Sequence, residues 1–311
     1  MADITPTTRV ERAISDPESI TPATRLEKFI ANISGAEYEL TPATRIEKLL
    51  DAAGDAAGSG EWSTEGIANN SEPNGDIIID NIYIEKYALA YKPITSITAP
   101  TVTDIGQYGL YYCSNLTDVY FPSLTAVHDH TFEYTGLSTL ELNSLIQTGI
   151  NSFANNTALT SVKLPSLQYI GGSQGASSKI GIFKGCTSLN MVIAPLLKVL
   201  QGHDFDGCIN LTILDFPSLV MMRAYCFNLS GLETLILRNN SVCSMAAVNC
   251  FAGTPFSSSG TGGTLYVPSN LITSYESNAN WNTILSYTNN SIQAIEGSQY
   301  ENYYADGTPV T

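Results

Sequence analysis

The sequence predicts an α/β-type repeat protein rich in short strands, built as a solenoid of about seven units of about 22 residues that follow N-terminal short-helix repeats. Two observations support this fold class. From residue 94 to residue 251 one apolar pattern recurs every 21 or 22 residues, with a single gap of 30. From residue 5 to residue 48 an unrelated motif recurs three times. A unit this short cannot bury its own apolar side, so the units are expected to stack.

Each solenoid unit starts at an apolar residue, and these leading residues are Ile94, Leu116, Leu137, Leu159, Leu189, Leu211 and Leu232. Apolar residues follow three and five positions later, as Val119 and Phe121 do after Leu116. This alternation predicts a short strand with one face turned inward. Proline follows in five units and ends the strand, whereas Asn143 and Arg238 replace it in the other two. Such a period and spacing indicate a leucine-rich repeat.

Most units close on an aromatic residue, which predicts a buried column along the solenoid: Phe132, Phe153, Phe183, Phe205, Phe227 and Phe251. The six cysteines also occupy repeated positions, either three residues before a leading leucine, directly before a closing phenylalanine, or at an inward site. Free cysteine behaves as a small buried apolar residue. We therefore expect the cysteines to pack in the core rather than form disulfides or bind a metal.

The repeat pattern predicts the domain boundaries. The solenoid is assigned to residues 77–255, where 77–91 resemble a partial first unit and the excess around 171–179 is a surface loop. A C-terminal cap is assigned to 256–296. Pro268 ends its first strand, a helix over 269–285 carries Leu271, Tyr275 and Trp281 to cover the apolar end, and 292–295 add a strand. Residues 297–311 are a tail.

Residues 1–54 carry the motif TPATRIEK and two variants of it. Threonine before proline is a typical helix start, and the residues that follow give an apolar stripe. These short helices are candidates for attachment or oligomerisation, by packing on one another, on sister copies or on a larger assembly, although a helical appendage without a partner also fits. The candidate contact residues are Leu26, Phe29, Ile30, Ile46, Leu49 and Leu50. Residues 55–76 read as a flexible linker.

The composition of the chain limits the kinds of partner that it can bind. The net charge is -15, from 29 acidic and 14 basic residues, which argues against nucleic acid or an anionic membrane as the main partner. The sequence has no apolar run long enough to span a membrane, so membrane insertion is not expected. The first residues lack the basic and apolar regions of a secretory signal peptide.

No catalytic, cofactor or metal site is expected. The segment 171–175 matches G-x-S-x-G, but it lies in an insertion rather than at a strand-to-helix turn. His128-Asp129-His130 and His203-Asp204 could suggest a metal. However, His130 and His203 stand three units apart, about 14 Å at a typical strand spacing. We therefore expect these histidine and aspartate residues to be solvated loop residues.

The outward positions of the strands are the best candidates for a function. They become apolar in the second half of the solenoid, and exposed apolar area often marks an interface. The competing interpretation is that the C-terminal segment or a sister subunit covers this area. The candidate partner-binding residues are Tyr120, Met191, Ile193, Ile213 and Ile236.

The unit L-x-x-V-x-F-P-S-L-x-x-V, the endings GIFKGCTSL and HDFDGCINL, and the segment LYVPSNLITSYESNANW resemble the BspA-like leucine-rich repeat family over about 82–290. That resemblance implies a non-enzymatic role in adhesion or partner binding. The TPATRIEK repeats resemble segments of gut bacteriophage virion proteins. Together they suggest a virion fibre or decoration protein that binds a protein or surface glycan on a bacterial cell and attaches to the virion or to sister subunits through its N-terminal helices. The alternative is a bacterial cell-surface or extracellular adhesin that binds host protein or another cell.

Overall fold

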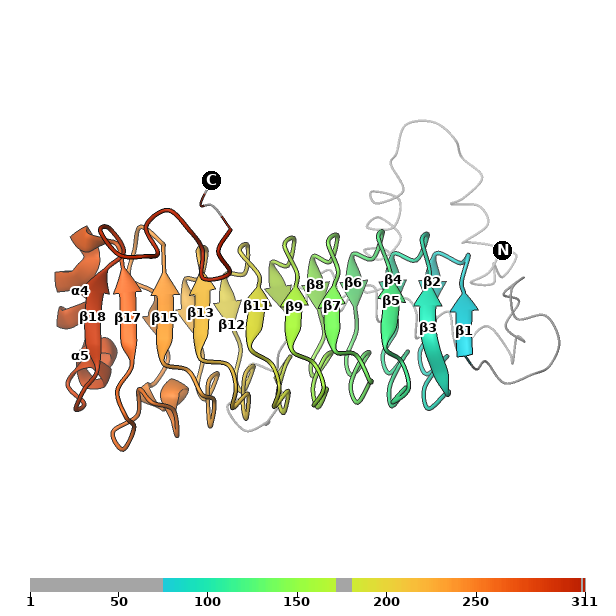
Figure 1. Cartoon of the computed structure of the whole chain (residues 1–311), viewed down its shortest axis with the longest axis horizontal. Helices are drawn as coiled ribbons and strands as arrows, with labels where there is room; N and C mark the ends of the chain where they lie inside the picture. Colours follow the sequence, from blue (N-terminus) through green and yellow to red (C-terminus); the bar gives the residue numbers. More distant parts are fainter. Residues whose placement is uncertain (1–74, 172–180, 309, 311) are drawn as a thin grey trace, which may run out of the picture. The chain divides into compact units, whose positions relative to one another are not determined.

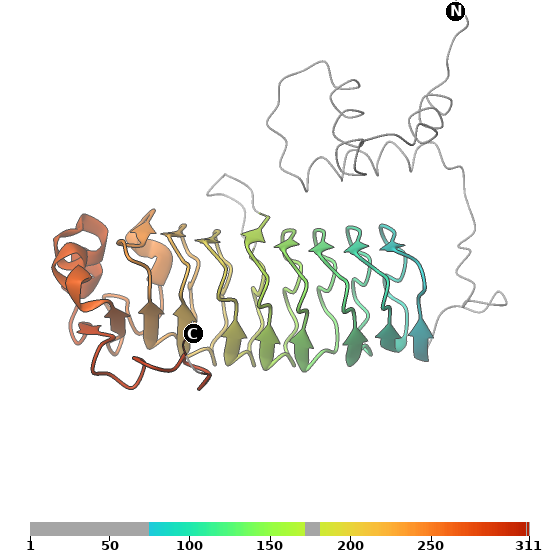
Figure 2. The same ribbon diagram turned by 90° about the horizontal axis from the view of Figure 1, so that it is seen from above.

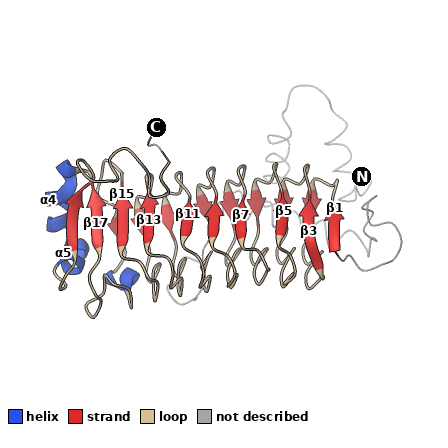
Figure 3. Cartoon of the chain, in the orientation of Figure 1, coloured by secondary structure: helices blue, strands red, loops and turns tan. Residues whose placement is uncertain are grey.

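The computed structural model describes residues 75–171, 181–308 and 310, and these form a parallel β-solenoid (Figures 1 and 2). The N-terminal repeats, most of the linker and the insertion after Gly171 lie outside the described residues. The solenoid has little helix (Figure 3), so the α/β-type expectation is corrected to a β-solenoid. Its return path contains left-handed residues such as His130 and Asn151, which interrupt any helix.

A row of parallel strands, the first ladder, forms the long face of the solenoid (Figure 1), and it is divided into three hydrogen-bonded sheets of three, three and four strands. Its strands are β1 (Gly75–Ile78), β3 (Ile94–Thr98), β5 (Asp118–Tyr120), β7 (Thr139–Glu141), β9 (Ser161–Lys163), β11 (Met191–Ile193), β13 (Ile213–Phe216), β15 (Thr234–Leu237), β17 (Thr264–Val267) and β18 (Ser291–Ala294). β1 starts inside the range assigned to the linker, so the described solenoid includes a coil before the first full repeat.

A second row of two-residue strands, the second ladder, lines the return path and is divided into two hydrogen-bonded sheets of five and three strands. Its strands are β2 (Tyr83–Ile84), β4 (Asp104–Ile105), β6 (Ala126–Val127), β8 (Gln147–Thr148), β10 (Tyr169–Ile170), β12 (Val199–Leu200), β14 (Met221–Met222) and β16 (Ser244–Met245). Within each sheet the strands keep one register from coil to coil, apart from a shift between Gly75 and Asp76 in β1. Ile97 pairs with Val119 and Leu214 pairs with Leu235, so inward residues always meet inward residues.

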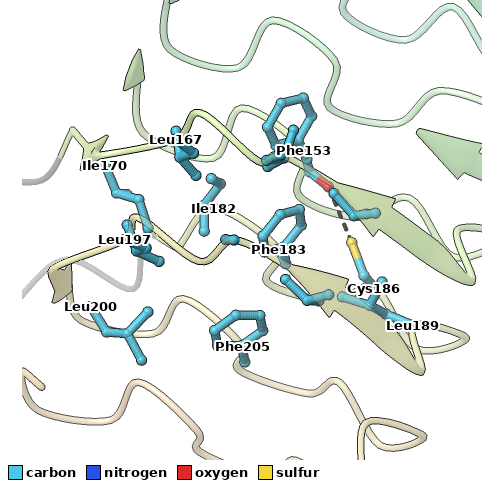
Figure 4. Packing of buried hydrophobic residues seen from close by; sticks show 14 of the residues in the cluster. Phe153, Leu167, Ile170, Ile182, Phe183, Cys186, Leu189, Leu197, Leu200 and Phe205 are labelled. Carbon is cyan, nitrogen blue, oxygen red and sulfur yellow. Dashed lines mark hydrogen bonds between the residues drawn. The ribbon is translucent and has the colours of Figure 1, made fainter. Parts of the chain in front are cut away.

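The predicted phenylalanine column forms the centre of the core (Figure 4). Its six rings are at most 2% exposed. Neighbouring rings stack with centroids 5.5 Å apart between Phe153 and Phe132, 5.6 Å between Phe153 and Phe183, and 5.5 Å between Phe183 and Phe205. Offset stacks in this range add to the stabilisation from burial. Each coil is therefore stabilised mainly by the coil on either side of it.

The six cysteines are free and buried, as the repeat positions predict. Four of them also link coils, because each thiol donates a hydrogen bond to a carbonyl of the preceding coil. Cys186 reaches Phe153 at 3.1 Å and Cys208 reaches Phe183 at 3.2 Å. Burial raises the pKa of Cys186 to about 12, so its thiol stays protonated at neutral pH.

Short helices cover the last coil, as predicted from 269–285, but they form three segments rather than one. They are η2 (Ser269–Leu271), α4 (Ile272–Ser277) and α5 (Ala279–Leu285), and a further turn, η1 (Val248–Phe251), carries Phe251 into the core. The break lies at Asn278, whose extended backbone lets its side chain cap α5. Trp281 is fully buried, and its ring centroid lies 5.9 Å from that of Phe251. None of the described helices has the length and apolar character needed to cross a membrane.

Candidate functional site

A groove of about 400 Å³ lies on the strand face between β11, β13 and the C-terminal tail. After β18 the chain turns back along the strand face over β17 and β15 (Figure 2), so the tail forms one wall of the groove. Its strand wall includes Met191, Ile193 and Ile213, and its tail wall includes Tyr304. The lining is mainly apolar. Such a groove suits an apolar group of a partner.

The tail is held by Arg238, the residue that replaces proline after the seventh strand. Its Nε and Nη2 donate to the two carboxylate oxygens of Asp215 at 2.9 and 2.7 Å. Its Nη1 and Nη2 also donate to the carbonyls of Tyr300 and Tyr303 at 2.8 and 3.0 Å. The backbone N–H of Ala305 donates to Asp215 at 3.1 Å. One buried ion pair therefore anchors the tail at three residues.

The Asp215–Arg238 pair is shielded from water, with side chains 6% and 11% exposed. The guanidinium also lies 5.0 Å from the ring centroid of Tyr304, in cation–π contact. Burial raises the pKa of Asp215, although the hydrogen bonds and charge of Arg238 oppose the rise. Asp215 therefore holds the tail through both its charge and its hydrogen bonds, and its role in the groove is structural.

The structure brings three of the five predicted partner-binding residues together. Met191, Ile193 and Ile213 line the groove and are partly exposed. Tyr120 is 59% exposed but lies on β5, three strands from β11 and outside the groove. The expectation that Ile236 faces outward to a partner is wrong, because its side chain is fully buried.

The tail explains the burial of Ile236. In the ladder this residue stands between Asp215 and Tyr266. Asp215 is bonded to the tail at Ala305, and the Tyr266 ring packs edge-on against Tyr300 with centroids 4.9 Å apart. The competing interpretation, a cover made by the C-terminal segment, therefore applies at Ile236. The candidate attachment residues from Leu26 to Leu50 lie outside the described residues.

Sequence reasoning missed Arg238, Asp215 and the tail as parts of the site. Arg238 carried a signal, since it breaks the proline column. Asp215 stood in the outward strand column beside apolar residues. The tail carried no such signal, because its contacts with the strands join residues 62 to 90 positions apart without any repeat to relate them.

The expectation that the histidine segments are solvated loops is wrong for three residues. His128 and His203 are 8% exposed and Asp204 is 1% exposed. Two hydrogen bonds offset the cost of burying Asp204. Its carboxyl accepts from the backbone N–H of Gln201 at 2.6 Å and of Ile182 at 3.3 Å. Asp204 thereby satisfies the N–H group of Gln201 in its own turn and joins its coil to the preceding coil at Ile182. Among the described residues, no three His, Cys, Asp or Glu side chains are grouped to hold a metal ion.

Burial raises the pKa of Asp204 to about 7, and its two N–H donors offset part of the rise. The folded state thus holds the carboxyl proton of Asp204 more tightly than the unfolded state does. Its stabilising contribution is complete below about pH 3.8 and is lost as the pH rises through about 7. We expect the free energy of unfolding to fall by about 2 kcal/mol more between pH 5 and pH 7 in the natural chain than in Asp204→Asn.

Chemical denaturation of both proteins at the two pH values measures this difference. Any fixed cost of the asparagine cancels, because only the change with pH is compared. An identical pH dependence in the two proteins would show that Asp204 does not titrate in this range.

The strand ladders, the inward columns and the helical cap define a leucine-rich repeat solenoid. A family model described as "BspA type Leucine rich repeat region" matches residues 82–181 and 177–279, so the chain belongs to that family. A comparison with curated proteins gives no significant match.

The solved structures that resemble the chain include the following three. The leucine-rich repeat protein TpLRR of T. pallidum is 21% identical, with 44% of this chain and 77% of that chain covered and a TM-score of 0.36. A leucine-rich repeat protein of Bacteroides ovatus is 20% identical, with 61% and 59% covered and a TM-score of 0.34. A leucine rich cell surface protein of Faecalibacterium prausnitzii is 15% identical, with 74% and 89% covered and a TM-score of 0.25. TM-scores this low carry no functional information.

Proposed function

We propose that the chain is a non-enzymatic binding protein of a bacterial surface, and that the strand-face groove takes an apolar side chain of a partner protein. The observation that carries this proposal is the groove itself: apolar walls at Met191, Ile193 and Ile213, with the tail held over them by a buried Arg–Asp pair. A pre-formed concave apolar site surrounded by polar groups is the usual form of a protein anchor pocket.

The groove chemistry favours binding over catalysis. The titratable side chains that line it are Asp215, Tyr304 and Asp306. Asp215 is occupied by Arg238 and by the N–H of Ala305, so it is not placed to exchange protons with a substrate. The Tyr304 ring packs over Arg238. The lining therefore offers shape and apolar area, which are what recognition requires.

Ile193→Asp and Ile213→Asp, made separately, are expected to weaken binding to the target cell at least tenfold, because each places a charge against the apolar group that fills the groove. Flow cytometry with fluorescently labelled protein on host cells and on other bacterial cells, the two kinds of target open to a surface adhesin, gives the affinity. Circular dichroism checks that each variant is folded. Tyr169→Asp is the matched control, since Tyr169 is 57% exposed on the second ladder, away from the groove.

Unchanged binding by both folded groove variants would remove the groove as the contact site. Treating the cells with protease or with periodate then separates partner classes. A protein partner is lost after protease, whereas a surface glycan is lost after periodate and would contradict the choice of a protein.

The prediction of a virion fibre or decoration protein rests on the TPATRIEK repeats, which lie outside the described residues. The family match to 82–279 does not support that prediction. We therefore propose the bacterial surface as the location. Mass spectrometry of cell-envelope fractions and of purified virions from the same culture tests this. Recovery in virions and absence from envelopes would reverse the assignment to a fibre or decoration protein.

A further inference from the structure

A second surface, separate from the groove, is formed by aromatic side chains on the turns of the first three coils. Six rings make two stacks that run along the solenoid: Tyr87, Tyr108 and His130 in one, and Tyr91, Tyr112 and Tyr134 in the other. We call these six residues and Tyr111, which stands between the stacks, the tyrosine surface.

The rings of the tyrosine surface are closely packed. In the first stack the centroids of Tyr87 and Tyr108 are 4.8 Å apart, and the Tyr108 ring lies 4.6 Å from that of His130. Tyr111 meets Tyr108 edge-on at 5.1 Å and Tyr91 edge-on at 5.5 Å. Rigid tyrosine rings offer a large contact area with little entropy to lose on binding.

The backbone conformation at the stacked positions does not favour tyrosine. All six residues of the stacks have positive φ angles, between 58° and 63°. Left-handed backbone favours glycine and asparagine over other residues. The same two positions in later coils hold Asn151, Asn155, Gly185 and Gly207, although His203, Tyr225 and Leu229 also occupy them. Tyrosine at these positions in the first coils opposes the backbone preference, so the rings themselves call for an explanation.

Three rings of the stacks are open to solvent. Tyr91 is 67% exposed, Tyr87 is 53% exposed and Tyr112 is 41% exposed. Burial in the core explains the phenylalanine column, but it does not explain aromatic side chains as exposed as these. An exposed, pre-ordered cluster of tyrosines has the composition of a protein-binding hot spot.

The charges around the rings favour a cationic group. Glu133 lies beneath the surface, bonded to His130 Nδ1 and to Asn155 Nδ2 at 2.8 Å. Burial first, and the Glu133 charge second, raise the pKa of Tyr111 to about 12. Lys86 Nζ already lies 5.7 Å from the Tyr87 centroid. Glu133 therefore places negative charge next to Tyr111, and the Lys86 ammonium lies over the Tyr87 ring.

Elsewhere in the chain, an aromatic ring and a carboxylate jointly bind one guanidinium group. Arg238 bonds to Asp215 while its guanidinium lies over the Tyr304 ring. We propose that the tyrosine surface binds a basic segment of a partner protein, with arginine side chains lying on the exposed ring faces. The net charge of -15 would bring such a segment to the solenoid.

The test uses a short fluorescent arginine–glycine peptide and a lysine–glycine peptide of equal charge. We expect the natural chain to bind the arginine peptide about tenfold more tightly, because guanidinium groups stack on rings as well as carrying charge. The combined variant Tyr87→Asn, Tyr91→Asn, Tyr112→Asn should bind both peptides equally and weakly. Asparagine suits the backbone, since Asn151 and Asn155 occupy equivalent turns. Fluorescence anisotropy measures each affinity.

Tyr120→Asn and Tyr169→Asn are the matched controls, being 59% and 57% exposed outside the surface, and both should keep the arginine preference. Three results would overturn the proposal: no binding by the natural chain, equal arginine binding by the triple variant, or displacement of the peptide by a neutral polysaccharide, which would assign the surface to a glycan. Ile193→Asp should leave peptide binding unchanged, so failure of the groove and failure of this surface are distinguishable.

Discussion

Replacing Arg238 with alanine is expected to lower the free energy of unfolding by about 3–5 kcal/mol, the usual cost of removing one partner of a buried ion pair. The variant leaves the Asp215 carboxylate buried without its cation, and the carbonyls of Tyr300 and Tyr303 lose their donors. The tail should then detach from the strand face. Chemical denaturation measures the stability, and limited proteolysis after Tyr300 measures the release of the tail.

The double variant Arg238→Ala, Asp215→Ala separates charge from packing. Removing both groups also removes the unpaired buried carboxylate, so the double variant should be more stable than Arg238→Ala alone. Lys163→Ala is the control for loss of a positive charge, because Lys163 is exposed on β9 of the same face. If Arg238→Ala cost no more than Lys163→Ala, the ion pair would not be what holds the tail, and the groove would need another explanation.

Much of the solenoid could be predicted because its contacts are repeated. Cys186 lies beside Phe153 of the previous coil for the same reason that Cys208 lies beside Phe183: both pairs are one unit apart once the insertion is counted. A residue's column therefore predicts its neighbours. The same rule placed the closing phenylalanines in one stack, and it explained the cysteines without disulfides.

Contacts outside the repeat could not be predicted in this way. Arg238 reaches Tyr303, and Asp215 reaches Ala305, through a chain reversal after β18 that no periodic pattern records. Ile236 looked outward from its strand position alone, but its exposure depended on that reversal. Exposure on a strand face is a property of the whole fold, whereas side-chain direction is a property of the strand.

The tyrosine surface lies between these two cases. Tyr87 and Tyr91 match Tyr108 and Tyr112 in sequence, and that match identified the first coil as a repeat. The left-handed turns that expose these rings have no apolar signature, so the match did not indicate an exposed surface. Buried Asp204 was missed for a similar reason, because an aspartate whose partners are backbone N–H groups resembles a loop residue in the sequence.

Phe205→Ala is expected to cost about 3–5 kcal/mol, as large-to-small changes at a well-packed aromatic residue do. Phe205 is fully buried, and its ring lies 5.5 Å from Phe183 and 5.8 Å from Phe227 between centroids. Alanine therefore weakens two coil interfaces at once. In a repeat protein stability is approximately a sum of such nearest-neighbour terms, so the loss is not shared over the whole fold.

Phe205→Leu tests the cause, because the first full unit already holds Leu110 in this column and buries it completely. Leucine fills most of the space that alanine leaves empty, so this variant should cost only about 1 kcal/mol. Leu229→Ala, at a side chain 58% exposed beside the column, should cost less than about 0.5 kcal/mol. Chemical denaturation of the three variants ranks them. Equal losses for the alanine and leucine variants at position 205 would mean that ring stacking, rather than filled volume, couples the coils.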